Sequence, residues 1–125
     1  MDSHLLLSLF HIFAVVPLLL YVAINRADTA RPVYGVLLVL GAIVTLYHGY
    51  KAWNRFVAGS SALWISALHF VYVGPLLMYI GYRGKDTPRY AYELLALFAF
   101  AALGYHTYHL IMSMNIVMDD AKNKS

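Results

Sequence analysis

The chain consists of four long apolar stretches separated by short polar connectors. The stretches contain no Asp, Glu, Lys or Arg and cover residues 5–24, 32–50, 56–82 and 94–118. Each is close to or longer than the roughly 20 residues with which a helix, rising about 1.5 Å per residue, crosses about 30 Å of hydrocarbon. The pattern predicts four membrane-spanning helices, at about residues 5–24, 32–51, 60–82 and 90–116.

Composition supports a membrane location. Hydrophobic residues make up 62% of the chain and charged residues 12%. That leaves too little polar surface to coat a soluble domain of this size. The predicted fold class is therefore an all-α integral membrane protein that crosses the bilayer four times.

The chain also contains an internal repeat. Residues 8–53 align with residues 66–111 without insertion or deletion, and 15 of the 46 aligned positions are identical. A fixed period without gaps is typical of a structural repeat. Because each copy contains two predicted spans, both copies enter the membrane in the same orientation. The sequence thus predicts a tandem duplication of a two-helix hairpin, forming a four-helix bundle with a pseudo-two-fold axis along the membrane normal.

Two kinds of repeated residue mark positions along the spans. Pro17 and Pro75 lie in mid-span and lack a backbone N–H, so they predict helix kinks. Four tyrosines near helix ends on one side predict an interfacial aromatic belt: Tyr21, Tyr34, Tyr79 and Tyr92.

The repeat carries two histidines into each copy. His11 lies near the start of the first predicted span and His48 near the end of the second, so an antiparallel hairpin brings them to a similar depth. The same holds for His69 and His106. We therefore expect these four histidines to form one layer on the side of the membrane that holds the termini. The polar residues expected to support this layer are Ser8, Ser66, Tyr47, Tyr50, Tyr105 and Tyr108.

Three interpretations of the histidine layer compete. The first is hydrogen-bonding contact between helices, with no further chemistry. The second is a b-type haem or transition-metal centre with His11, His48, His69 and His106 as candidate ligands, since neutral imidazole binds Fe, Cu and Zn. The third is a proton or ion pathway gated by histidine protonation. The first interpretation, which needs no cofactor, is preferred.

Several functional classes are disfavoured. The chain has no cysteine, which rules out disulfides, iron–sulfur clusters and thiol catalysis. No phosphate-binding glycine loop or nucleophile elbow is found, and the connectors are too short to form a catalytic domain, which argues against an enzyme. The net charge of +3 is too small and scattered to indicate nucleic-acid binding. The expected partners are the lipid bilayer and either further copies of the chain or other membrane proteins.

The distribution of basic residues gives a prediction for orientation. Arg26, Arg31, Arg83, Lys85 and Arg89 lie on one side of the predicted spans. Lys51, Arg55, Lys122 and Lys124 lie on the other side, where the tail also contains Asp119 and Asp120. The positive-inside rule then favours termini that face away from the cytoplasm.

One phrase in each repeat resembles a known group of proteins. Residues 69–81 read HFVYVGPLLMYIG, echoed by residues 11–23. The shared His-x5-Pro-Leu-Leu-x-Tyr pattern resembles that of small, uncharacterised four-span membrane proteins of large DNA viruses. The resemblance implies a viral or host-derived membrane as the location and transfers no biochemical activity. The sequence thus predicts a multi-pass membrane protein with a non-enzymatic structural or interaction role.

Overall fold

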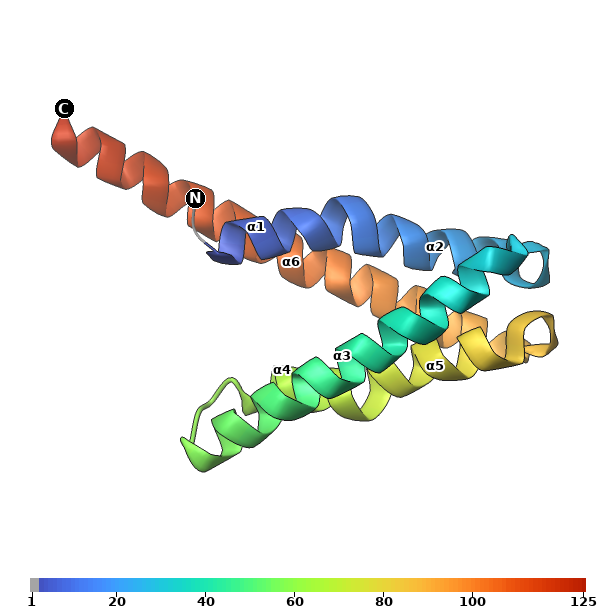
Figure 1. Ribbon diagram of the computed structural model, residues 1–125. Coiled ribbons are helices and arrows are strands. Elements are labelled where there is room, and N and C mark those ends of the chain that lie inside the picture. The colour runs from blue at the N-terminus through green and yellow to red at the C-terminus, as the bar shows by residue number, and fades with distance from the viewer. Residues whose placement is uncertain (1–2) are drawn as a thin grey trace.

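The computed structural model describes residues 3–125, which form helices joined by short connectors and contain no strand (Figure 1). Four helical segments are long and apolar enough to cross a membrane, judged by length and composition: Ser3–Asp28, Arg31–Val57, Leu63–Asp86 and Arg89–Lys124. The protein is therefore an all-helical chain with four candidate membrane spans.

The first and third segments share one succession of helix types. The first contains α1 (Ser3–Phe10), the π-helical turn η1 (His11–Val15), α2 (Val16–Asn25) and the 3-10 turn η2 (Arg26–Asp28). The third contains α4 (Leu63–Leu68), the π-helical turn η3 (His69–Val73), α5 (Gly74–Arg83) and the 3-10 turn η4 (Gly84–Asp86). The second and fourth segments are the continuous helices α3 (Arg31–Val57) and α6 (Arg89–Lys124).

The helices α3 and α6 extend beyond the apolar stretches from which they were predicted. Their expected ends were residues 51 and 116, but they continue to Val57 and Lys124. Residues 52–57 and 117–124 contain neither Gly nor Pro, so no residue in either extension favours a stop. Hydropathy predicts how much of a helix suits the hydrocarbon, whereas backbone chemistry determines where the helix ends.

A π-helical turn precedes each mid-span proline. The backbone N–H groups of Val16 and Gly74 donate to the carbonyls of His11 and His69, five residues earlier. The extra residue in this turn changes which side chains share a face. Ser8 and Val16 are both buried, although eight residues in an ideal α-helix, at about 100° each, would place them about 80° apart. The π turn therefore keeps the residues before and after it on the buried face.

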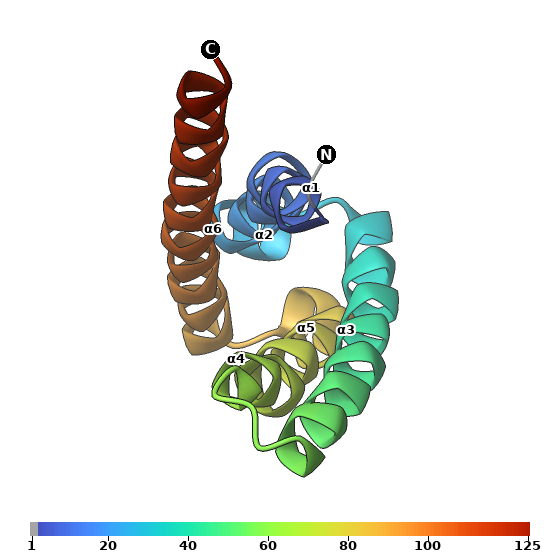
Figure 2. The ribbon, with the colours of Figure 1, turned by 90° about the vertical axis from the view of Figure 1, so that its left-hand side faces the viewer.

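Helices pack mainly against the other half of the chain. The first segment lies along α6, through α1 and α2, and α3 lies along α4, η3 and α5. Figure 1 shows these two helix pairs meeting near the connectors and diverging towards the termini, and Figure 2, turned by 90°, shows α6 beside α1 and α2, and α3 beside α4 and α5. The main packing partner of α2 is thus α6, not α3, which follows it in sequence.

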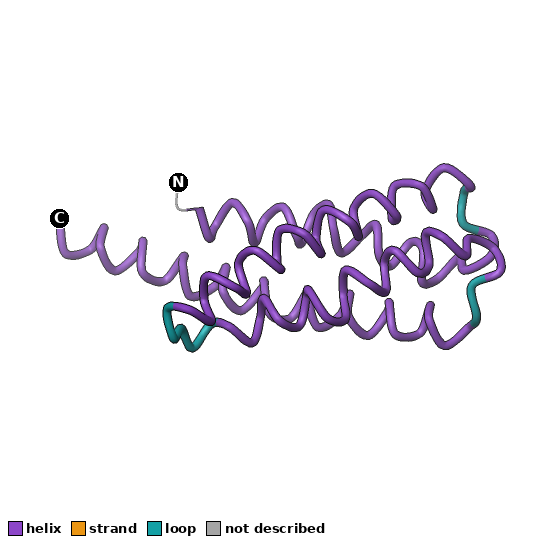
Figure 3. The backbone as a smooth tube through the Cα atoms, turned by 60° about the horizontal axis from the view of Figure 1, so that its bottom comes forward, coloured by secondary structure: helices purple, strands orange, loops and turns teal. Residues whose placement is uncertain are grey.

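The apolar core lies in the half of the bundle that carries the connectors between segments one and two and between segments three and four. Figure 3 places both of these connectors at the end opposite the termini. The buried core residues are Leu19, Val22, Ala23, Tyr34, Leu37, Leu77, Ile80, Ala91, Tyr92, Leu95 and Ala99. Several of them are 58 residues apart, such as Leu19 and Leu77 or Leu37 and Leu95.

The aromatic belt predicted from four tyrosines is wrong for two of them. Tyr34 and Tyr92 are buried, with 4% and 2% of their surface exposed, whereas Tyr21 and Tyr79 lie on the surface. The Tyr34 and Tyr92 hydroxyls are 2.8 Å apart, and each lies within hydrogen-bonding distance of the carbonyl at the start of the preceding 3-10 turn, Arg26 at 2.7 Å or Gly84 at 3.1 Å. The two hydroxyl protons can fill two of these three contacts at a time. A tyrosine can be buried in this way only because its hydroxyl finds such partners.

Candidate functional site

The four predicted site histidines form two stacked pairs. The rings of His11 and His106 have centroids 4.1 Å apart and planes inclined by 22°. Those of His48 and His69 lie 4.3 Å apart and are inclined by 20°. Each pair joins a residue of a π-helical turn to one on a long helix, η1 to α6 and η3 to α3. The pairs therefore form between residues of different repeats, not within each predicted hairpin.

Backbone hydrogen bonds orient one histidine of each pair. His11 Nδ1 lies 2.8 Å from the Leu7 carbonyl oxygen, and His69 Nδ1 lies 2.7 Å from that of Ile65. A carbonyl can only accept, so Nδ1 must carry the proton. In the neutral ring this leaves the lone pair on Nε2, the nitrogen that would bind a metal or accept a proton.

The partner histidines on the long helices are less uniform. His106 is buried, with 7% of its surface exposed. His48 is partly buried, and its Nδ1 is enclosed with no hydrogen-bond partner among the described residues. His106 interacts electrostatically with His69 of the other pair as well as with its stacking partner His11.

The stacking limits what the histidines can bind. A metal ion bonds an imidazole nitrogen in the plane of the ring, and two parallel rings about 4 Å apart cannot both meet that condition for one ion. Within residues 3–125 no group of three or more His, Asp or Glu side chains is arranged to hold a metal ion. A centre with two axial histidines, as in a b-type haem, would need one ring from each pair.

The residues predicted to support the layer occupy varied environments. Ser8 and Ser66 are buried. The Ser66 hydroxyl accepts a 2.6 Å hydrogen bond from Arg55. Tyr47 and Tyr105 contact their neighbours His48 and His106 edge-on, with centroids 5.1 and 5.2 Å apart. Tyr50 and Tyr108 are exposed on the outer surface, together with Tyr47.

Sequence reasoning missed two features, one beside the histidine pairs and one at the connector end of the bundle. Arg55, counted only as a connector charge, reaches the third segment through Ser66 and the Ala62 carbonyl, at 2.6 and 3.2 Å, and lies within electrostatic range of His48. The second feature is the contact between Tyr34 and Tyr92. Their identical position in both repeats was a usable signal, because residues on a symmetry axis meet their own copies.

The available comparisons do not identify this arrangement. No family model, no curated protein and no solved structure matches the chain.

Proposed function

We propose that the chain is a multi-pass integral membrane protein with a non-enzymatic structural or interaction role. The large side chains on its outside support membrane insertion. Phe13, Ile24 and Leu46 are 73%, 75% and 76% exposed, and many further aromatic and aliphatic side chains share this surface. Apolar exposure on this scale is unfavourable in water and suits hydrocarbon.

The observation that supports a structural role for the histidines is that each stacked pair connects two helices from different halves of the chain. Aromatic rings in contact add about 0.5–1.5 kcal/mol beyond the area they bury. Polar contacts between membrane helices contribute about 0.6 kcal/mol on average. One stacked histidine pair lies within each helix pair. Each would help to hold its two helices together in the half of the bundle away from the apolar core.

We further propose that the chain arose by duplication of a two-helix unit that acted as a homodimer. The matched π turns, the matched 3-10 turns and the contact between Tyr34 and Tyr92 support this origin. Packing between the two halves is what a former dimer interface would leave after fusion. The location in a viral or host-derived membrane stays a prediction from the shared motif.

Membrane insertion can be tested with single cysteines, because the chain has none of its own. We expect Ala27→Cys and Ser61→Cys, both exposed at opposite ends of the bundle, to react with a membrane-impermeant maleimide from opposite sides. Leu46→Cys should stay unreactive in membranes despite its exposure, because lipid covers it. Labelling of Leu46→Cys at the rate of Ala27→Cys in intact vesicles would contradict a membrane location.

A haem or metal centre is the second candidate. It is favoured by the backbone bonds to His11 and His69, which would present the Nε2 of each ring to a ligand. An absorption spectrum of the purified protein, oxidised and reduced, with elemental analysis for Fe, Cu and Zn, separates the two candidates. A structural role predicts neither a Soret band nor stoichiometric metal. A signal that is present in the wild type and lost in His69→Phe would establish the second candidate.

A further inference from the structure

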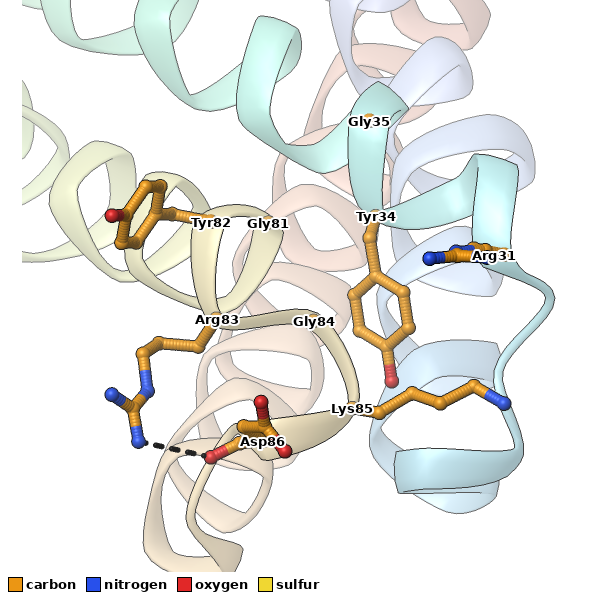
Figure 4. A pocket seen from close by; sticks show the side chains of 9 residues that line it. All are labelled: Arg31, Tyr34, Gly35, Gly81, Tyr82, Arg83, Gly84, Lys85 and Asp86. Atoms are coloured by element: carbon orange, nitrogen blue, oxygen red, sulfur yellow. Dashed lines mark hydrogen bonds between the residues drawn. The ribbon is translucent and has the colours of Figure 1, made fainter.

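The connector end of the bundle contains an open pocket of about 610 Å³ between the start of α3, the end of α5 and η4. Figure 4 shows Arg83 and Asp86 on the side formed by α5 and η4, and Arg31 on the side formed by α3. With Lys85, the lining carries three cationic side chains and one carboxylate. The buried Tyr34 forms one wall, and Gly35 leaves space because it has no side chain.

None of the three cationic side chains of the pocket forms an ion pair with a carboxylate among residues 3–125. Within residues 3–125 the only ion pair joins Arg89 to Glu93, at 2.7 Å, outside the pocket. The Arg83 guanidinium donates to the backbone carbonyl of Asp86 at 3.3 Å, a bond that leaves its charge in place. The pocket therefore combines a positive excess with unoccupied hydrogen-bond donors.

The other repeat shows that the fold does not require this lining. At the positions 58 residues away, Asn25 replaces Arg83, Ala27 replaces Lys85 and Glu93 replaces Gly35. The two connectors nevertheless have the same 3-10 turn and the same tyrosine contact to it. The turn thus does not require Arg83 or Lys85, and the presence of these two residues in one copy alone needs another explanation.

We propose that this pocket binds a phosphate-bearing anion through Arg31, Arg83 and Lys85. Arginine recognises phosphate by paired N–H donors, and lysine adds a compact positive charge. The volume exceeds what a lone phosphate ion fills, so a larger phosphorylated group fits better. If the proposed membrane location holds, the nearest such group is the head of an anionic phospholipid, since basic pockets at membrane interfaces bind these head groups. A water-soluble phosphate compound is the other source.

The test measures lipid retained by the purified full-length protein. Native mass spectrometry from micelles with equal amounts of phosphatidylcholine and phosphatidylglycerol should show preferential retention of phosphatidylglycerol. A basic residue near an anionic surface contributes a factor of about five in affinity, so Arg83→Asn with Lys85→Ala should lower retention about 25-fold. These substitutions copy the other repeat, which folds with Asn and Ala at those positions.

Three single substitutions separate the pocket from general charge effects. Gly35→Glu should abolish retention by placing a carboxylate in the pocket, while Gly35→Gln, of similar size, should lower it much less. A Cβ at Gly35 meets nothing within 4 Å, so neither substitution clashes where its side chain leaves the backbone. Arg26→Gly removes one positive charge at the same end but outside the lining, and should retain phosphatidylglycerol as the wild type does. Equal loss in Gly35→Glu and Arg26→Gly would overturn a site in this pocket.

A second experiment distinguishes a phospholipid head group from a water-soluble phosphate compound. Inorganic phosphate and glycerol 3-phosphate are added separately to the lipid-free protein, and the melting temperature is recorded. A rise in the wild type that the double variant lacks, without preference for phosphatidylglycerol, would assign a soluble ligand. No effect in either experiment overturns the proposal. Alkaline carbonate extraction of the same variants reports membrane insertion, so failure of the pocket and failure of the membrane location give different results.

Discussion

The two helix pairs of the bundle use equivalent positions in different ways. Where α3 and α5 meet, Gly41, Gly74 and Gly81 face the other helix, and a Cβ atom on any of them would lie 3.1 Å or less from backbone atoms of that helix. The corresponding residues between α6 and α2 are Ala99, Val16 and Ala23, all of them buried. One pair is therefore held by close approach of the backbones, and the other by small and branched side chains between the helices. Both solutions are suited to a membrane, where packing must replace the hydrophobic effect.

The largest effect on stability should come from replacing Gly81 by alanine, the residue at the corresponding position of the other helix pair. A Cβ there would lie 2.6 Å from the Leu38 nitrogen and 2.7 Å from the Tyr34 carbonyl oxygen, so Gly81→Ala must push the backbones apart. We expect a loss of about 2–3 kcal/mol in the free energy of unfolding, as for overpacked cores. The reverse exchange, Ala23→Gly, should cost about 1 kcal/mol through helix propensity. SDS titration in mixed micelles, followed by circular dichroism, measures both. Equal losses of unfolding free energy in Gly81→Ala and Ala23→Gly would show that the two helix pairs do not differ in how closely their backbones approach.

A second test compares two glycines on the same helix. A Cβ at Gly41 would lie 2.7 Å from the Met78 nitrogen and 2.9 Å from the Gly74 carbonyl oxygen, whereas at Gly35 it meets nothing within 4 Å. Gly41→Ala should lose about 1–3 kcal/mol. Gly35→Ala should gain about 0.5–1 kcal/mol, since alanine favours the helix. The same unfolding titration applies, and a gain at Gly41 would show that α3 and α5 are less tightly packed than described.

The histidine pairs should respond differently to replacement by phenylalanine. His48→Phe keeps a ring to stack on His69 and removes a buried nitrogen without a partner, so we expect a change within about 1 kcal/mol or a small gain. His106 is more deeply buried, and the larger ring in His106→Phe should cost about 1–3 kcal/mol by overpacking. Melting temperatures measured in detergent rank the stability of the two variants. A large loss from His48→Phe would indicate that its nitrogen is needed, which favours the cofactor candidate.

The smallest expected effect lies at the ends of α2 and α5. Arg26 and Gly84 adopt nearly the same backbone conformation, with φ of 50° and 56° and ψ of −123° and −130°. Only glycine adopts this region without strain, which costs a larger residue about 1 kcal/mol or more. Arg26→Gly should therefore stabilise the protein by about 1 kcal/mol, and Gly84→Ala should destabilise it by a similar amount. Opposite signs for these two changes in the melting temperature confirm the strain; destabilisation by Arg26→Gly contradicts it.

Much of the fold could be predicted from the sequence because long apolar helices depend on local composition. The lack of charge over four long stretches predicted the four apolar helices, and the identities 58 residues apart predicted that matched positions would share an environment. The burial of Tyr34 and Tyr92 could not be predicted from local composition or from the identities between the repeats. Tyrosines near helix ends occur both in interfaces and in cores, and only the position of the other repeat decides between the two.

For the candidate site, the sequence determined which side chains exist and their approximate depth along the spans. The tertiary structure decided their partners. His11 stacks on His106 and His48 on His69 because each π turn changes which side chains share a face and the helices pack across the two halves. The structure likewise placed Arg83 and Lys85 in the lining of the same pocket as Arg31. Hydropathy and repeat identity are properties of residues along the chain, whereas stacking and shared charge depend on contacts that only packing creates.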